Sequence, residues 1–418
     1  MNITPSMVLR LAVVCGVAFA VCEIGTLSPA RAQQPPVVVA PPPAAAAPAE
    51  APPAAAPAST ALTTPSMTGP LVANPNPIAY ETEFGKVYVS GMISGLGIVQ
   101  ANASPGDHDR IDISNGQVIL QKTDGFFQFY AQAGIYSFPA LGTAYFSAER
   151  TTGNTFSPLP VAYIKLQPTD EFSVQAGKLP TLIGAESSFT FQNMNIERGL
   201  LWNQENLVNR GVQANYTAGP LAYSVSLNDG FYSDSYNWLI GSVAWTIDKA
   251  NTLTFVGGGN FDHTDKNRFL KTPFFQNNGD IFNAIYTYNA APWTITPYFQ
   301  YTSVPASPFN GALRGAETYG GAILASYGFT DNFSLAGRAE IIGSTGSAAS
   351  GSANPLGYGP GSSAFSFTLT PTWQEGIYFL RGEGSVVQIS SVAPGAGFGK
   401  TGSSKTQGRF LVEAGLIF

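Results

Sequence analysis

Six charged side chains near the end of the chain have the types and the spacing that could do chemistry. They form three Arg and Glu pairs at spacings of two or four residues, namely Arg338 and Glu340, Arg381 and Glu383, and Arg409 and Glu413. Residues at even spacings share one face of a β-strand. Opposite charges on one face can pair across strands or stay hydrated beside a water-filled space. The pattern predicts one continuous charged inner wall, although each residue could instead only brace that wall.

Residues suited to catalysis or metal binding are scarce. The only histidines are His108 and His263, each beside aspartates in the segments 107–109 and 262–265. Both segments are expected to be loops, whose polar tips are usually solvated, and no serine stands in a recognisable nucleophile context. We therefore expect no catalytic activity, no metal site and no cofactor, with an outer-membrane lipase or protease as the weaker alternative.

The start of the chain has the features of a secretory signal peptide. A short polar stretch with Arg10 precedes an apolar run over residues 11–22, which is too short to span a bilayer. Small residues around Arg31 then suit cleavage before Gln33, so residues 1–32 are expected to be removed. Both cysteines, Cys15 and Cys22, lie in this segment. The mature chain is therefore expected to be exported without disulfides or thiol chemistry.

Composition narrows the class of protein. Only 11% of the residues are charged, 12% are aromatic and 45 are Gly, yet no apolar run approaches the roughly 20 residues of a membrane helix. Residues 33–418 contain 18 basic and 25 acidic residues, a balance that argues against a nucleic-acid partner. These values suit an exported β protein whose outer face meets lipid. A large secreted β-helix or sandwich is the soluble competitor.

The mature chain divides into a linker and a folded region. Residues 33–58 are almost entirely Pro and Ala and have too few packing groups to fold, so we expect an extended, polyproline-rich tether. With the polar transition that follows, residues 33–79 form a periplasmic linker in this interpretation. Residues 80–418 then form an all-β domain.

Two kinds of connection separate the expected strands. Tight turns rich in Gly, Pro, Asn and Asp are expected near 123–125, 168–170, 218–220, 248–251, 290–292, 330–332 and 374–376. Longer polar loops are expected near 101–111, 138–157, 180–204, 230–236, 262–279, 305–316, 344–361 and 390–406. The sixteen strands between them are expected at 86–100, 112–122, 125–137, 158–167, 171–179, 205–217, 221–229, 237–247, 252–261, 280–289, 292–304, 317–329, 332–343, 362–372, 376–389 and 407–418. Short turns at one end and long loops at the other predict a transmembrane antiparallel β-barrel.

The last strand carries an alternating pattern up to the final residue. Phe410, Leu416 and Phe418 belong to an apolar row at period two, while Arg409 and Glu413 lie on the opposite face. A soluble sandwich strand could show the same alternation. A strand that ends on Phe resembles the signal read by the barrel-insertion machinery of bacterial outer membranes, so we expect the apolar row to face lipid and to act as that signal.

Four segments carry a family resemblance. They are VYVSGMISGLGIV at residues 87–99, AGKLPTLIGAE at 176–186, NIERGLLWNQENLVNRGVQANY at 195–216, and the terminal strand. The region from about Val87 to Phe418 resembles the β-barrel porin type 2 family, the OmpL-like porins of Gram-negative outer membranes. The resemblance implies a passive, water-filled pore for small hydrophilic solutes and ions, with outer-membrane lipids as surroundings and, by analogy, a homotrimer. A structural or adhesive barrel with a periplasmic tether is the alternative.

The third long loop, residues 180–204, is the candidate pore constriction. In sixteen-stranded porins the loop of this rank folds into the barrel and narrows it, and aromatic residues here supply groups that can pack. The charges then expected near the constriction are Glu186, Glu197, Arg198 and Glu205, opposed by Lys165 on the inner wall. Arg210 shares a strand face with apolar residues and therefore does not belong to the inner wall, so it is expected at the rim of the barrel. The alternative is a loop folded over the outer rim.

Overall fold

The computed structural model describes residues 69–103, 108–264, 275–308 and 311–418. The expected signal peptide and residues 33–68 of the expected linker lie outside these ranges. No helix in the described ranges is both long enough and apolar enough to cross a membrane.

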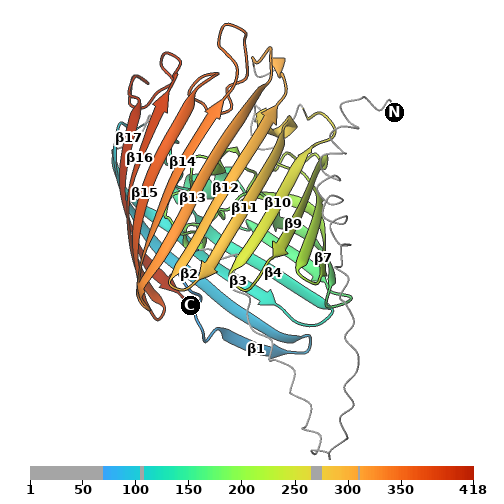
Figure 1. Cartoon of the computed structure of the whole chain (residues 1–418). Helices are drawn as coiled ribbons and strands as arrows, with labels where there is room; N and C mark the ends of the chain where they lie inside the picture. The colour runs from blue at the N-terminus through green and yellow to red at the C-terminus, as the bar shows by residue number, and fades with distance from the viewer. Residues whose placement is uncertain (1–68, 104–107, 265–274, 309–310) are drawn as a thin grey trace, which may run out of the picture.

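Sixteen antiparallel strands form a closed barrel (Figure 1). Each strand pairs with its neighbours in the chain, and β17 pairs with β2 to close the sheet. The strands are β2 (Gly85–Ala101), β3 (Asp109–Lys122), β4 (Phe127–Tyr136), β5 (Val161–Leu166), β6 (Phe172–Pro180), β7 (Val208–Ala218), β8 (Leu221–Asn228), β9 (Trp238–Thr246), β10 (Asn251–Asn260), β11 (Asp280–Ala290), β12 (Trp293–Val304), β13 (Ala316–Thr330), β14 (Phe333–Ser344), β15 (Ser363–Glu375), β16 (Tyr378–Ser390) and β17 (Thr406–Ile417). The predicted barrel and its sixteen strands are confirmed.

One further strand was not predicted. β1 (Ile78–Thr82) forms a hairpin with the start of β2, with Ile78 opposite Val89 and Thr82 opposite Gly85. All five of its residues are exposed, so it has no buried face to give an alternating pattern. β-sheet pairing therefore begins at Ile78, whereas the sequence analysis placed the start of the folded domain at residue 80.

The last residue closes the barrel. The Phe418 N–H donates to the Gly91 carbonyl and the Gly91 N–H donates to the Phe418 carbonyl, both at 2.9 Å. A Cβ built on Gly91 would lie 2.7 Å from Cζ of Phe418, so the aromatic ring can rest on β2 only because residue 91 is Gly. Phe410 is 57% exposed on the outer face, whereas Arg409 and Glu413 are buried inside. This alternation between faces agrees with the pattern read from the sequence.

Long and short connections lie at opposite ends of the barrel (Figure 1). We call residues 137–160 loop L2 and residues 181–207 loop L3. L2 contains α2 (Ala148–Asn154), and L3 contains the 3₁₀ turns η1 (Thr190–Gln192) and η2 (Trp202–Gln204). A further 3₁₀ turn, η3 (Phe275–Asn278), lies in a later loop. The end with the short connections also holds β1, and we refer to it as the periplasmic end.

Candidate functional site

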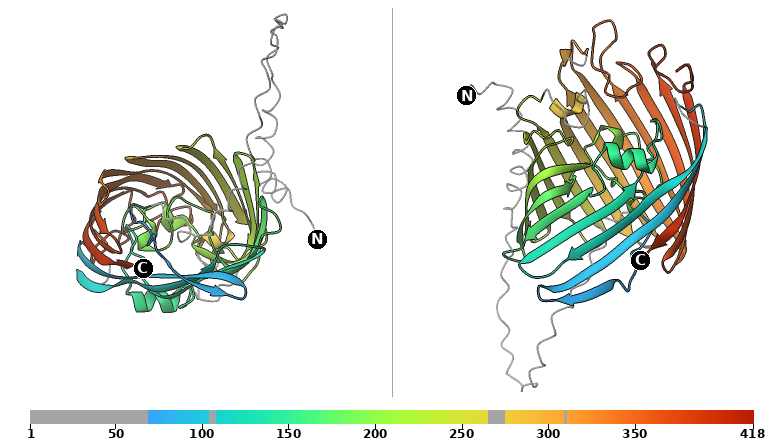
Figure 2. Two further views of the ribbon diagram at one scale, coloured as in Figure 1. Left: turned by 90° about the horizontal axis from the view of Figure 1, so that it is seen from below. Right: turned by 180° about the vertical axis from the view of Figure 1, so that it is seen from behind.

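L3 lies inside the barrel rather than over its outer rim (Figure 2, left). It leaves β6, reaches the inner face of β14 to β17, and returns to β7. Phe189, which precedes η1, and Phe191 within it are buried in an aromatic and aliphatic cluster with Tyr136 and with inner-wall residues such as Met92 and Ile119. The aromatic residues that suggested an ordered loop in the sequence are therefore the groups that pack it inside.

Two wall carboxylates hold the backbone of L3. The Glu383 carboxylate accepts the N–H groups of Ile196 at 2.5 Å and Glu197 at 2.9 Å. The Glu340 carboxylate accepts those of Leu200 at 3.0 Å and Leu201 at 3.3 Å. Each carboxylate thus takes two successive amides, as an anion does in a backbone nest. Hydrogen bonds to a charged acceptor are stronger than neutral ones, so these four bonds fix the loop against the wall.

Two wall arginines bind L3 through its carbonyl groups and acidic side chains. Arg338 pairs with Glu186 at 2.5 Å and also donates to the Glu197 carbonyl at 2.7 Å. Arg381 donates to the carbonyls of Thr190 and Asn193, both at 3.0 Å. The planar guanidinium has several donors in fixed directions, so one side chain can satisfy loop and wall together.

The third wall arginine connects L3 with L2. Arg409 pairs with Glu197 at 2.6 Å and donates to the Ala140 carbonyl at 2.8 Å and to the Thr143 carbonyl. The backbones of the two loops also meet, because the Arg198 N–H donates to the Pro139 carbonyl at 3.0 Å. L2 and L3 therefore form one packed unit on this side of the barrel.

The six wall charges lie on the inner face, but they are not hydrated. Arg381 pairs across strands with Glu413 at 2.5 Å, and Arg338 also lies 3.2 Å from Glu340 on its own strand. None of the six is more than 5% exposed, because L2 and L3 cover them. The sequence left open whether these charges are hydrated or paired, and the structure shows them buried and paired or hydrogen-bonded within the protein. We call this group the latch and use the name for Arg338, Glu340, Arg381, Glu383, Arg409 and Glu413.

Two of the predicted constriction residues have few partners. Burial lowers the pKa of Arg198 to about 10. Within the described ranges its guanidinium donates only to the Ile196 carbonyl, at 3.2 Å, and it lies 5.6 Å from the Trp202 ring. Burial raises the pKa of Glu205 well above its ordinary value, and neither carboxyl oxygen has a hydrogen-bond partner among the described residues. Glu205 rests on Gly184, whose φ of +84° and missing side chain leave room for the carboxyl group.

Lys165 and Arg210 lie apart from the latch. Lys165 is on β5, partly exposed and inward-facing by its parity with Tyr163, and it forms no ion pair with another described residue. It forms no ion pair with the acidic residues of L3; two of these, Glu186 and Glu197, pair with wall arginines instead. Arg210 binds Asp229 at 2.7 Å and Asp234 at 3.1 Å beside a neighbouring loop, as expected for a rim residue.

The sequence prediction missed the character of the opposite wall. Several inward-facing positions in the periplasmic half of β6 to β11 are partly exposed and carry uncharged polar groups, namely Gln175, Asn215, Ser224, Ser242, Thr254 and Thr287. Their Ser, Thr, Asn and Gln content at period two was a readable signal, although a weaker one than the Arg and Glu pairs. We call this surface the neutral wall. Among the described residues of β5 to β13, Lys165 is the single charged side chain that faces inward.

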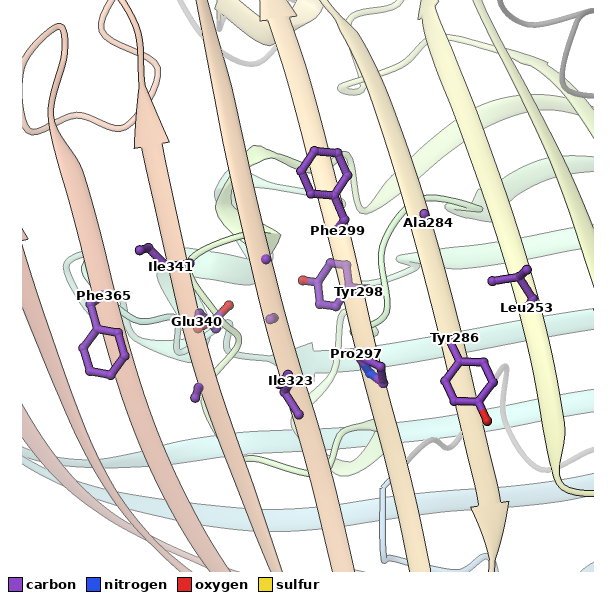
Figure 3. Close-up of a pocket in the computed structure, with 13 residues that line it drawn as sticks. Leu253, Ala284, Tyr286, Pro297, Tyr298, Phe299, Ile323, Glu340, Ile341 and Phe365 are labelled. Carbon is purple, nitrogen blue, oxygen red and sulfur yellow. The ribbon is translucent and has the colours of Figure 1, made fainter.

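An apolar hollow of about 750 Å³ lies over β10 to β15 on the lipid side (Figure 3). Phe299, Ile323, Ile341 and Phe365 line it and belong to exposed outward-facing rows. Buried positions such as Glu340 alternate with them along the strands. The hollow is therefore a depression in the outer surface and not a site for a hydrophilic solute.

No group of three or more His, Cys, Asp or Glu residues suited to a metal ion occurs within the described ranges. Of the two histidine segments, Asp107 and Asp265 lie outside these ranges.

Comparisons with known proteins agree with this architecture. The family described as "Putative beta-barrel porin-2, OmpL-like" matches residues 86–418. No curated protein sequence matches the chain.

Solved structures share the fold at low sequence identity. The outer membrane channel DcaP of Acinetobacter baumannii is 10% identical, with a TM-score of 0.55 over 81% of this chain and 99% of that one. OmpF of Salmonella typhi, in a complex with daunomycin, is 11% identical, with a TM-score of 0.55 over 82% and 100%. OmpT of Vibrio cholerae in a trimer form is 10% identical, with a TM-score of 0.51 over 79% and 99%. At these identities the likeness shows the fold alone.

Proposed function

We propose that this chain, which belongs to the β-barrel porin-2, OmpL-like family of the bacterial outer membrane, forms a water-filled channel. Small hydrophilic solutes and ions diffuse through this channel passively, and L3 narrows it. The observation that carries the proposal is the attachment of L3 to the inner wall by wall carboxylates and arginines. A barrel of sixteen strands is wide enough to leave an aqueous space, so a loop fixed inside it reduces the open cross-section.

The neutral wall supports the same proposal. Its hydroxyl and amide groups face inward and are partly exposed, so they can exchange hydrogen bonds with water and with polar solutes. Passive diffusion requires no chemical step, and we propose no catalytic role.

The proposal also covers export, insertion and assembly. Residues 1–32 direct export, and the insertion machinery reads the terminal strand with Phe410, Leu416 and Phe418. The protein assembles as a homotrimer, like the trimer form of Vibrio OmpT.

Single-channel recording in planar bilayers tests the proposal. The purified protein is expected to insert in steps and to conduct ohmically. Folded protein that leaves the bilayer silent would contradict the porin assignment and favour a structural or adhesive barrel.

Deleting residues 185–200 tests the constriction separately. The deletion removes the part of L3 that lies on the latch, so single-channel conductance is expected to rise because the open cross-section grows. A shorter deletion of residues 346–351, in a mostly exposed part of the loop between β14 and β15, leaves the latch intact and serves as the control. Unchanged conductance after the L3 deletion would mean that the narrowest point lies elsewhere.

A further inference from the structure

The chain immediately before β1 runs inside the periplasmic end of the barrel. We call residues 69–77 the strap; it lies across the ring of strands when the molecule is viewed from below (Figure 2, left). Leu71 is 1% exposed and packs in a cluster with Met92 of β2, Phe379 of β16 and Ile417 of β17. These three partners face inward, so Leu71 lies within the barrel and not beneath it.

A wall side chain fixes the strap through its backbone. Oε1 of Gln374 accepts the Val72 N–H at 2.9 Å, and Nε2 of Gln374 donates to the Val72 carbonyl at 2.9 Å. One amide side chain therefore satisfies both backbone groups of one residue, as a neighbouring strand would. Gln374 is the last inward-facing residue of β15 and is largely buried, so this anchor lies at the rim of the periplasmic opening.

The strap also touches L3. A Cβ built on Gly69 would overlap the carbonyl group of Asn193, so the two backbones approach as closely as Gly allows. The Asn193 carbonyl is itself held by Arg381. The strap is thereby connected to the wall through Gln374 and to the latched part of L3 through Gly69.

We propose that the strap is a second constriction element, which lies under L3 and limits the channel from the periplasmic side. Below the latch, the inner wall next to the strap is closed: Thr372, Phe379 and Ile417 are buried. The neutral wall opposite remains partly exposed at the same end of the barrel. The strap and L3 thus fill the same half of the cross-section and leave the passage along the neutral wall.

Thiol accessibility tests the position of the strap without any measurement of transport. Both cysteines lie within residues 1–32, so a chain that begins at Gln33 has none and single cysteines can be introduced. In folded protein reconstituted into vesicles, Leu71→Cys is expected to react slowly with a charged, membrane-impermeant thiol reagent. Val72→Cys is expected to react fast, since residue 72 is 63% exposed. Equal rates at the two positions would overturn the proposal.

A second variant opens the strap on purpose. Gly69→Val adds a side chain where the Asn193 backbone leaves no space, so it is expected to displace the strap and to speed the reaction of Leu71→Cys in the same chain. A rate that stays slow in this double variant would contradict the contact between strap and L3.

Conductance tests the functional part, which rests on the proposed function. Gln374→Ala removes both bonds to Val72 and is expected to raise single-channel conductance, and so is Gly69→Val. Glu83→Gln, in the exposed turn between β1 and β2, is the control and is expected to conduct like the wild type. Wild-type conductance in Gln374→Ala and Gly69→Val, in a barrel that conducts, would refute the second constriction and leave the porin assignment intact.

Discussion

The two halves of the inner wall differ in almost every respect. The inner face of β14 to β17 carries three carboxylates and three arginines, and Glu186 of L3 lies against them. All seven side chains are buried under packed loops. On β5 to β11, the inward-facing groups in the periplasmic half are neutral, apart from Lys165, and several of them are partly exposed. The charged half attaches a loop, and in our proposal the neutral half is the surface that borders water. If that proposal holds, charge on an inner wall does not indicate where a solute passes.

The difference has a physical cause. A loop that crosses an aqueous lumen has backbone amides and carbonyls that must be satisfied when it becomes buried. The latch supplies charged partners for these groups at strand positions that cannot move. A neutral wall lacks groups of such strength, so it would hold a loop weakly and remain open.

The largest expected difference between the halves is in stability. Arg381→Met removes the partner of Glu413 and the donor to two L3 carbonyls, which leaves a buried carboxylate unpaired. Breaking a buried pair from one side costs about 3–5 kcal/mol. Lys165→Met on the neutral wall should change the free energy of unfolding by only about 0.5 kcal/mol, since it removes no ion pair. Urea unfolding in lipid vesicles measures both values.

A double variant separates charge from packing in this prediction. Arg381→Met with Glu413→Gln removes both charges, so part of the lost stability should return. Similar losses for Arg381→Met and Lys165→Met would mean that the two halves do not differ as described.

The sequence predicted the barrel better than it predicted the latch. Period-two rows and turn residues are local, so sixteen strands and the inward face of Arg409 and Glu413 could be read from the chain. Whether a charge on that face borders water depends on what covers it, and the contacts of Glu383 with residues 196 and 197 span 186 residues or more. The strap was missed for a related reason. Its anchor joins Val72 to Gln374, which are 302 residues apart in the chain, and no local sequence pattern predicts such a contact.

A smaller effect is expected from Glu205, the buried carboxyl group without a partner. Its pKa is raised in the folded state, chiefly by burial, so between the ordinary value of 4.5 and the raised value the unfolded chain is ionised while the folded chain is protonated. Rising pH across this window therefore lowers stability. Glu205→Gln removes the titration and should therefore stabilise the protein at about pH 8, by about 1.4 kcal/mol for each pH unit that separates the folded and unfolded pKa values of Glu205.

The pH dependence is the control for this prediction. At about pH 4, below the ordinary glutamate value, wild type and Glu205→Gln should have the same unfolding midpoint in urea. The same substitution at Glu186, which is paired with Arg338, should instead destabilise at about pH 8. A gain for Glu205→Gln that persists at low pH would trace the effect to packing and not to ionisation.

The smallest expected effect is on ion selectivity, and it is also the sharpest test of which half borders the passage. Lys165→Gln and Glu383→Gln each remove one charge, the first from the neutral wall and the second from the latch. Only a charge beside the water path influences which ions enter, because a buried charge is already balanced by its neighbours. Lys165→Gln should therefore shift the reversal potential in a salt gradient toward cation preference. Glu383→Gln keeps one acceptor oxygen for the L3 amides and should leave the reversal potential near the wild-type value. The opposite outcome, a shift from Glu383→Gln alone, would place the passage along the charged half and reverse the roles assigned to the two walls.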